Sequence, residues 1–281
     1  MNKLIKQPYH ITCSRNDYNI HEQRVLIRIL EKLQKEMVLK KTPLDLFDDL
    51  KSGVTLSFKV KDFMLRNSKN YFSVRNSLDS LMSKDIGMRG SEKNKGCYFI
   101  KSKLISEYKY YLNNEFVEVT ITKSVLAYLL SLSPYTRYCI DVAFNTQSPY
   151  TSRIYQYISH WRDKYNGFIM VLKVDTVKEL LSLGSKYKRA NSIRQVILLP
   201  AMKELKEKAD IWFSIKEPIK EGRKVVGWKL QLYKRKETSS EIQQLSSGKE
   251  AQESKRREAI FIEQERKNLL ALAERFKNKT K

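Results

Sequence analysis

The sequence is poor in the residues that build metal sites and disulfide frameworks. Its 281 residues include three histidines and three cysteines, Cys13, Cys97 and Cys139. An odd number of cysteines without C-x-x-C spacing favours neither a disulfide framework nor a zinc site, and free thiols suit a reducing compartment. We therefore expect no metal, no cofactor and a cytoplasmic location.

A long apolar run is also missing. The longest stretch without a charged residue, 124–136, is well short of the roughly 20 residues of a membrane-spanning helix. The N-terminal segment has no apolar core of signal-peptide length. Basic residues are spread through the chain and do not gather on one amphipathic helix. We expect neither export nor a membrane partner.

Acidic residues are too few to balance the basic ones. The chain has 54 lysines and arginines against 31 aspartates and glutamates, a net charge of +23, yet 41% of its residues are hydrophobic. Disordered polycations lack this apolar content, so the chain folds. Residues 236–281 hold 11 basic and 8 acidic residues, which leaves +20 on residues 1–235. The positive field of the folded part favours a polyanion, and double-stranded DNA is the expected partner.

The first half of the chain alternates helix and strand patterns. Apolar residues recur at spacings of three and four after Asn19, which predicts a core-facing helix over 20–37. Alternating apolar and polar residues over 54–60 predict a half-buried strand. The further predicted elements are a short helix from Asp62, a helix over 71–84, a turn-rich stretch around Gly87, Gly90 and Gly96, a hairpin pairing 96–112 with 115–122, and a helix over 124–132.

The second half repeats this order of elements. In its long helix Pro200 either kinks the chain or starts a new turn, because proline has no backbone N–H. The repeated order indicates an internal duplication. The predicted elements are a helix near Pro149, a strand over 167–174, a short helix capped by Asp175 and ending at Gly184, a long helix over 189–208, and strands over 210–218 and 223–234 around a charged turn.

Helix, strand, helix, helix and hairpin is the order of a winged helix. In the related helix-turn-helix proteins the second helix enters the major groove. The expected fold class is α+β, with two tandem winged-helix domains related by internal duplication and a charged helical C-terminal tail. Domain 1 spans residues 1–135 and contacts DNA more weakly, domain 2 spans 136–235 and is the main DNA-reading domain, and 236–281 form a flexible linker and the charged helical tail.

The helix over 189–208 has an apolar and a polar side. The apolar side, predicted to be buried, holds Ala190, Ile193, Val196, Ile197 and Ala201. The polar side carries amides suited to adenine and basic groups suited to guanine or phosphate. A solvated helix face has a similar composition, but the charge of the folded part favours DNA. The predicted DNA-binding residues are Lys186, Lys188, Arg189, Asn191, Ser192, Arg194 and Gln195.

Two further sets of polar and basic residues are predicted to contact DNA. One lies at the turn of the last hairpin, where side chains reach the backbone or the minor groove, although solvated turn residues are the alternative. The other surrounds the corresponding helix of domain 1, where the charge of Asp79 weakens the contact. The hairpin set is Lys220, Arg223 and Lys224, and the domain 1 set is Lys69, Asn70, Ser73, Arg75 and Asn76.

The second half also carries motifs in a specific order. They are a helix with Arg153 and Tyr155, a helix ending in Leu-Gly before Tyr187, the run I-x-x-V-I-x-x-P-A-x-x-E-L over 193–205, and Gly222-Arg223 before the last strand. In these features the chain resembles the Rep_3 family, the initiator replication proteins of theta-replicating bacterial plasmids. Residues 16–34 resemble the first helix of that family, so the resemblance covers about residues 10–235.

The resemblance implies two winged-helix domains that bind repeated sites, called iterons, at a plasmid origin. It also implies that the monomer opens the duplex and recruits the host initiator and helicase, while a homodimer formed through domain 1 represses its own gene. The charged extension beyond Lys236 departs from the simplest family pattern. We therefore predict a plasmid replication initiator whose partners are double-stranded DNA and host replication proteins.

Catalytic functions find little support in the residues. A rolling-circle nickase needs two histidines around one hydrophobic residue and a tyrosine nucleophile, and His10, His21 and His160 form no such pair. The segment GRKVVGWKL from Gly222 has the glycine spacing of a phosphate loop, but Trp228 replaces the lysine. We predict no enzymatic activity and no catalytic residue. The alternative that stays open is a winged-helix transcriptional regulator with no role in initiation.

Overall fold

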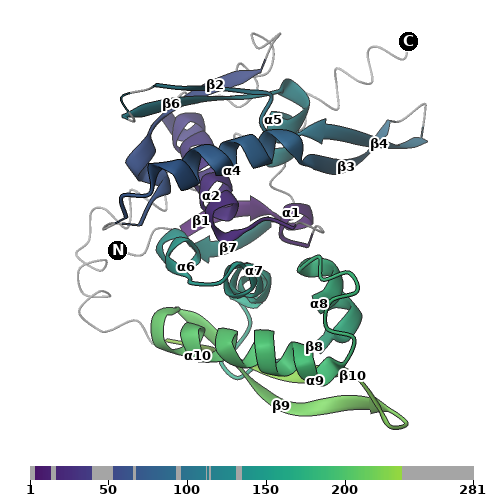
Figure 1. Ribbon diagram of the computed structural model, residues 1–281. Helices are drawn as coiled ribbons and strands as arrows, with labels where there is room; N and C mark the ends of the chain where they lie inside the picture. The colour runs from purple at the N-terminus through teal and green to yellow at the C-terminus, as the bar shows by residue number, and fades with distance from the viewer. Residues whose placement is uncertain are drawn as a thin grey trace, which may run out of the picture. The chain divides into compact units, whose positions relative to one another are not determined.

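The computed structural model describes residues 4–13, 17–39, 53–65, 68–92, 96–111, 113, 115–130 and 135–235 (Figure 1). The linker and charged helix expected over 236–281 lie outside the described residues. Within the described ranges, no helix combines the length and the apolar character that a membrane crossing requires.

The first half is built around a long helix and a three-stranded antiparallel sheet of order β2-β6-β5. Two smaller antiparallel pairs, β3 with β4 and β1 with β7, complete it (Figure 1). The elements are β1 (Leu4–Pro8), α1 (Tyr9–Cys13), α2 (Ile20–Leu39), β2 (Val54–Lys59), η1 (Val60–Phe63), α4 (Tyr71–Ser83), β3 (Asp85–Glu92), β4 (Gly96–Lys103), β5 (Glu107–Tyr110), β6 (Phe116–Ile121), α5 (Lys123–Leu130), β7 (Tyr135–Cys139) and α6 (Ile140–Asn145).

The start of α2 is fixed by a reciprocal cap. The side chain of Asn19 accepts a hydrogen bond from the N–H of Glu22 (3.0 Å), and the Glu22 carboxylate accepts one from the N–H of Asn19 (2.7 Å). The same carboxylate is fully buried and pairs with Lys84, just after α4, at 2.8 Å. The cap therefore also holds α2 against α4. The helix predicted from the apolar spacing is confirmed, with its stripe from Val25 to Leu33 in the core.

One prediction for the first half is wrong. The glycine-containing stretch expected to form turns is strand β3, which pairs with β4 in register from Asp85↔Lys103 to Glu92↔Gly96. Only the last part of the expected hairpin pairs as predicted, β5 with β6. Glycines weaken a strand but do not prevent one when a partner strand supplies the hydrogen bonds. The first half thus carries an extra hairpin, β3–β4, between α4 and the strands β5 and β6.

The second half forms one sheet of order β8-β10-β9 covered by helices (Figure 1). Its order of helix, strand, short helix, long helix and hairpin repeats that of α2, β2, η1, α4 and β5–β6. Asp175 lies in the first turn of α8 rather than at the cap, which is Lys173. The elements are α7 (Pro149–Ile158), η2 (Ser159–Trp161), β8 (Ile169–Lys173), α8 (Val174–Leu180), α9 (Ala190–Ile193), η3 (Arg194–Leu198), α10 (Leu199–Lys208), β9 (Ile211–Glu221) and β10 (Lys224–Lys234).

The predicted long helix is continuous but changes its winding. Residues 194–198 form a π-turn, η3, in which the N–H of Leu199 donates to the carbonyl of Arg194. Pro200 follows at the start of α10, where its missing N–H removes one α-type bond. The wider turn re-aligns the buried side, which consists of Ile193, Ile197, Leu198, Ala201 and Leu205, each at most 1% exposed. The prediction that Val196 is buried is wrong, because this side chain is 51% exposed.

Helix α7 packs on both halves. It contacts α1, α2 and β7 of the first half, and α10 and β9 of the second. Arg153 of α7 is 3% exposed and donates to the backbone carbonyls of Ile11 and Thr12 at 3.3 and 3.1 Å. Burial lowers the pKa of this guanidinium to about 10, so it stays charged at neutral pH. The two halves therefore share one helix.

Candidate nucleic-acid interface

The loop between α8 and α9 follows an unusual backbone path. Ser182, Gly184 and Tyr187 all have left-handed backbone angles, with φ of 49°, 54° and 56°. Residues with a Cβ rarely adopt this region, so surrounding contacts must hold Ser182 and Tyr187 there. The Tyr187 ring packs against the core, and burial together with the adjacent Tyr187 hydroxyl raises the pKa of Tyr150. This anchor fixes the chain just before the first turn of α9.

The predicted residues of the domain 2 helix lie together on this loop and on the outward side of α9–η3. Within the described part of the chain, these seven side chains make no hydrogen bond or ion pair with other residues. Their donors and acceptors are therefore open to a ligand. The exposed residues are Lys186, Lys188, Arg189, Asn191 and Gln195, and the half-exposed ones are Ser192 and Arg194.

The hairpin β9–β10 presents the second predicted set at its tip. Glu221 pairs with Lys224, so the connecting loop has two residues, Gly222 and Arg223. Gly222 has φ of 59°, and glycine at the first loop position is typical of a tight hairpin turn. Lys220, Arg223 and Lys224 are all exposed at this tip. The structure thus gives the hairpin the shape and charge of a basic wing.

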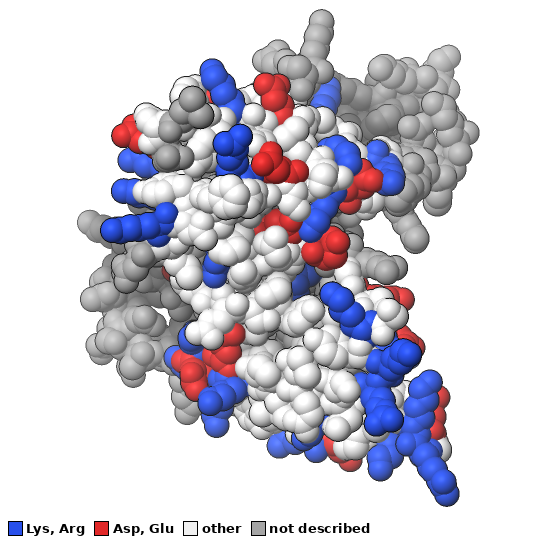
Figure 2. Space-filling model, viewed as in Figure 1, with Lys and Arg blue, Asp and Glu red and all other residues white. Residues whose placement is uncertain are grey.

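Lysine and arginine side chains gather on one side of this half. Figure 2 shows them toward its lower right, over the region that Figure 1 assigns to the α8–α9 loop and the tip of the β9–β10 hairpin. Phosphate groups are held by such basic residues and by the positive end of a helix dipole. The charge is therefore concentrated where the outward side of α9 and the wing meet solvent.

The predicted set of domain 1 is divided between two roles. Asn70 caps α4 by accepting a hydrogen bond from the N–H of Ser73 (3.0 Å), and the Ser73 hydroxyl donates to the Asn70 carbonyl (2.7 Å). The side chains of Lys69, Arg75 and Asn76 are exposed. A capping side chain has fewer free groups for DNA. Two of the five predicted residues, Asn70 and Ser73, thus use part of their hydrogen-bonding capacity at the start of α4.

Two apolar residues of the outward helix sides were not among the predicted site residues. Val196 is 51% exposed on η3, and Phe72 is 71% exposed in the first turn of α4. Phe72 could have been added to the predicted set from the sequence, because it lies between Asn70 and Arg75 of that set. Val196 could not, because regular α-helical spacing places it with the core residues.

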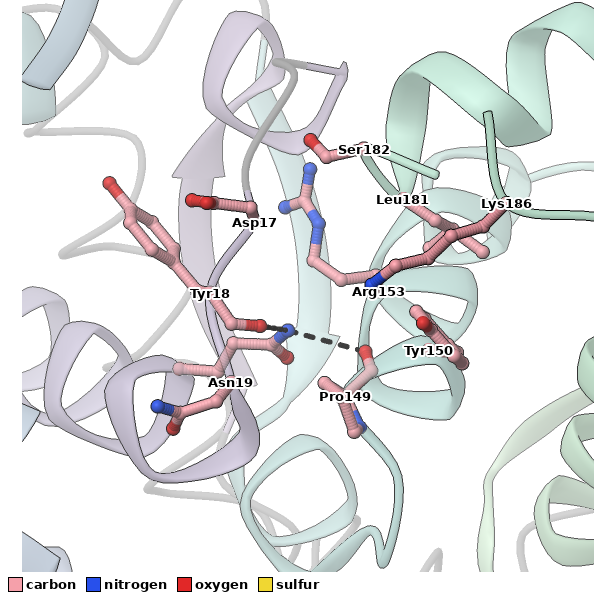
Figure 3. A pocket seen from close by; sticks show the side chains of 10 residues that line it. Asp17, Tyr18, Asn19, Pro149, Tyr150, Arg153, Leu181, Ser182 and Lys186 are labelled. Carbon is pink, nitrogen blue, oxygen red and sulfur yellow. Dashed lines mark hydrogen bonds between the residues drawn. The ribbon is translucent and has the colours of Figure 1, made fainter. Parts of the chain in front are cut away.

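A small pocket lies behind the α8–α9 loop. Its volume is about 200 Å³. Figure 3 shows Tyr150 and Arg153 of α7 and Ser182 and Lys186 of the loop around it, together with the segment before α2. The amide of Gln23, in the first turn of α2, donates to the carbonyls of Tyr18 (3.1 Å) and Pro149 (3.3 Å). The pocket therefore lies where the first half, α7 and the loop that carries Lys186 meet.

The comparison with protein families gives two matches. The family described as initiator Rep protein, WH2, matches residues 173–232, and initiator replication protein, WH1, matches residues 4–159. The chain belongs to the initiator Rep protein family. This confirms the resemblance carried by the motifs and the prediction of two winged-helix domains, and it makes the protein a replication initiator. No significant match is found among curated proteins.

Solved structures are similar to this initiator at low sequence identity. The crystal structure of the Pi initiator protein in complex with iteron DNA matches with a TM-score of 0.65 and 18% identity, over 84% of this chain and 99% of that chain. The X-ray structure of the WH1 domain of MSBI1.176, a replication protein isolated from a multiple sclerosis patient, matches with a TM-score of 0.28 and 12% identity, over 39% of this chain and 79% of that chain. The first match shows the same overall fold.

Proposed function

We propose that this initiator binds iterons, repeated double-stranded DNA sites, at a plasmid origin and promotes the opening of that origin. The observation that carries the proposal is the coincidence of two features. The fold matches a protein crystallised with iteron DNA over 99% of that protein. At the same positions where a winged helix docks, the chain presents open polar and basic side chains on α9 and on the wing.

In the proposed complex α9 and η3 enter the major groove. Asn191 and Gln195 reach base edges, where an amide bonds bidentately to adenine. Lys186, Lys188 and Arg189 meet phosphates at the start of the helix, with Ser192 and Arg194 at its flanks. The wing residues Lys220, Arg223 and Lys224 hold the adjacent backbone. Base contacts then supply sequence preference, and phosphate contacts supply most of the salt-dependent affinity.

The two domains are proposed to contact DNA through different helices, α9–η3 in the second and α4 in the first. We assign the main DNA reading to residues 136–235 and a weaker contact to residues 1–135, through Lys69, Arg75 and Asn76 with the cap residues Asn70 and Ser73 beside them. A homodimer through domain 1, repression of the protein's own gene and recruitment of the host initiator and helicase are proposed from the family resemblance.

The proposed role is binding, without catalysis and without a cofactor. An initiator of this kind marks the origin and alters the duplex through contacts, so it needs no nucleophile or metal of its own. It acts where the plasmid is, in the cytoplasm. Among the described residues, histidine, cysteine and carboxylate side chains do not form a cluster that could hold a metal ion.

Footprinting of the purified full chain over its own replicon tests the proposal. We expect protection of several direct repeats with regular spacing, and loss of replicon maintenance when the gene is deleted. A transcriptional regulator would instead protect a single inverted repeat upstream of its gene. Unchanged copy number after deletion of the gene would contradict the initiation role, and absence of any footprint would contradict the DNA-binding role.

A further inference from the structure

We call the continuous helix formed by α9, η3 and α10, whose first part is proposed to enter the major groove, the recognition helix. Val196 is an apolar side chain within the polar outward side of this helix. It follows Gln195 directly and lies four residues after Ser192, and it is 51% exposed. Isolated exposed apolar residues are common on protein surfaces and need no special reason. The position of Val196 sets it apart, because its exposed neighbours are the residues proposed to contact bases.

The π-turn explains why Val196 faces outward. In η3 the backbone bonds span five residues, as in the bond from the N–H of Leu199 to the carbonyl of Arg194. Ile197 and Leu198 consequently face the core together, at 1% and 0% exposure, and Val196 turns away from it. A β-branched residue does not favour an exposed helical position, so helix propensity gives no reason for valine there. The exposed isopropyl group is thus available for a contact outside the chain.

The major groove offers one group that matches an apolar side chain. Each base pair displays donors and acceptors along its edge, and thymine adds a methyl group at C5. The amides of Asn191 and Gln195 suit the adenine of an A·T pair, so thymine stands beside the same part of the helix. We infer that Val196 is a specificity-determining residue that packs against the 5-methyl group of a thymine in the binding site. This inference rests on the proposed DNA-binding function.

Replacement of thymine by deoxyuridine tests the inference, because uracil differs from thymine only by the missing methyl group. Each thymine in one footprinted repeat is replaced in turn, and the affinity of the full chain is measured by fluorescence anisotropy at constant salt. We expect one position at which the loss of the methyl group weakens binding about 4-fold, the value for one buried methyl-sized group. Val196→Ala should weaken binding to the thymine site by a similar factor and should no longer distinguish uracil from thymine there.

A matched variant controls for the loss of an exposed valine. Val171 on β8 is equally exposed, at 51%, and lies on a different element. Val171→Ala should bind like the wild type and keep its response to uracil. The inference fails if the wild type binds every uracil-containing repeat as tightly as the thymine form, or if Val196→Ala still senses the methyl group, as it would if Val196 contacted a protein instead. Failure of the proposed function is recognised separately, as no preference of the wild type for its own repeats over scrambled DNA.

Discussion

The hydroxyl group of Tyr155, in the middle of α7, donates a hydrogen bond of 2.6 Å to Oδ1 of Asp210, between α10 and β9. The same hydroxyl accepts a bond from the N–H of Cys139 at 2.9 Å, and Arg162 forms an ion pair with Oδ2 of Asp210. Burial raises the pKa of Tyr155 well above its ordinary value, so the phenol keeps its proton. These bonds therefore hold the chain just after α10, the end of the recognition helix, against α7 and β7.

Loss of the Asp210 charge should loosen this connection. In Asp210→Asn the half-buried guanidinium of Arg162 loses its counter-charge, so we expect unfolding to become easier by about 2 kcal/mol, as for a charged hydrogen bond. Urea denaturation of the full chain measures the change. Asp163→Asn is the matched control, because Asp163 pairs with Arg137 at 74% side-chain exposure and such surface pairs contribute at most about 1 kcal/mol. Equal losses in both variants would contradict the special role of Asp210.

Removal of the amides should lower sequence preference. Asn191→Ala and Gln195→Ala are each expected to weaken binding to the cognate repeat by about 1 to 3 kcal/mol and to bind scrambled DNA as the wild type does. Anisotropy titrations with the cognate and the scrambled duplex measure both affinities. The exposed amide of Gln147, just before α7, provides a control that should leave both affinities unchanged. Undiminished discrimination in both α9 variants would remove these residues from the base contacts.

Removal of phosphate contacts should change the salt dependence instead. Lys186→Ala and Lys220→Ala should weaken cognate and scrambled DNA alike, and each should reduce the slope of log K against log salt by about one. Lys229→Ala serves as the control, because Lys229 pairs with Glu217 at 2.5 Å on the sheet. A slope that stays at the wild-type value would show that Lys186 and Lys220 do not neutralise phosphates.

Acid should destabilise the fold through His160. Its ring packs against Tyr9 in a tilted arrangement and against Trp161 edge to face, with centroids 4.1 and 5.1 Å away, and burial lowers the pKa of the imidazole. The native state therefore holds fewer protons than the unfolded state, so stability is present above the ordinary pKa of about 6.5 and is lost as the pH falls below it. We expect His160→Gln to lose part of the difference in unfolding free energy between about pH 7.5 and about pH 5.

His21 should contribute to the acid sensitivity independently of His160. Burial also lowers the pKa of His21, near the start of α2, so His21→Gln should remove another part of the difference. The two parts should add in the double variant, because His21 and His160 have no interaction partner in common among the described residues. Full acid sensitivity in His160→Gln would show that this ring does not carry the effect.

Much of the fold was predictable because local patterns and packing agree. The apolar stripe of α2 and its start after Asn19, the alternation in β2 and the glycine at the wing turn all lie where the sequence indicates. Strand β3 was not predictable, since its glycines argue for turns and only pairing with β4 makes it a strand. The positions of the basic residues at the loop and the wing tip were predicted, whereas their function stays a prediction.

The sequence by itself determined the repeated order of elements, the charge and the motifs that place this chain among the replication initiators, because these depend on composition and short spacings. The tertiary structure decided which side of the recognition helix is buried. Regular spacing assigns Val196 to the core, but the π-turn before Pro200 aligns Ile197 and Leu198 there and turns Val196 outward. Helix winding responds to the packing of the whole helix against α7 and β9, which local spacing does not contain.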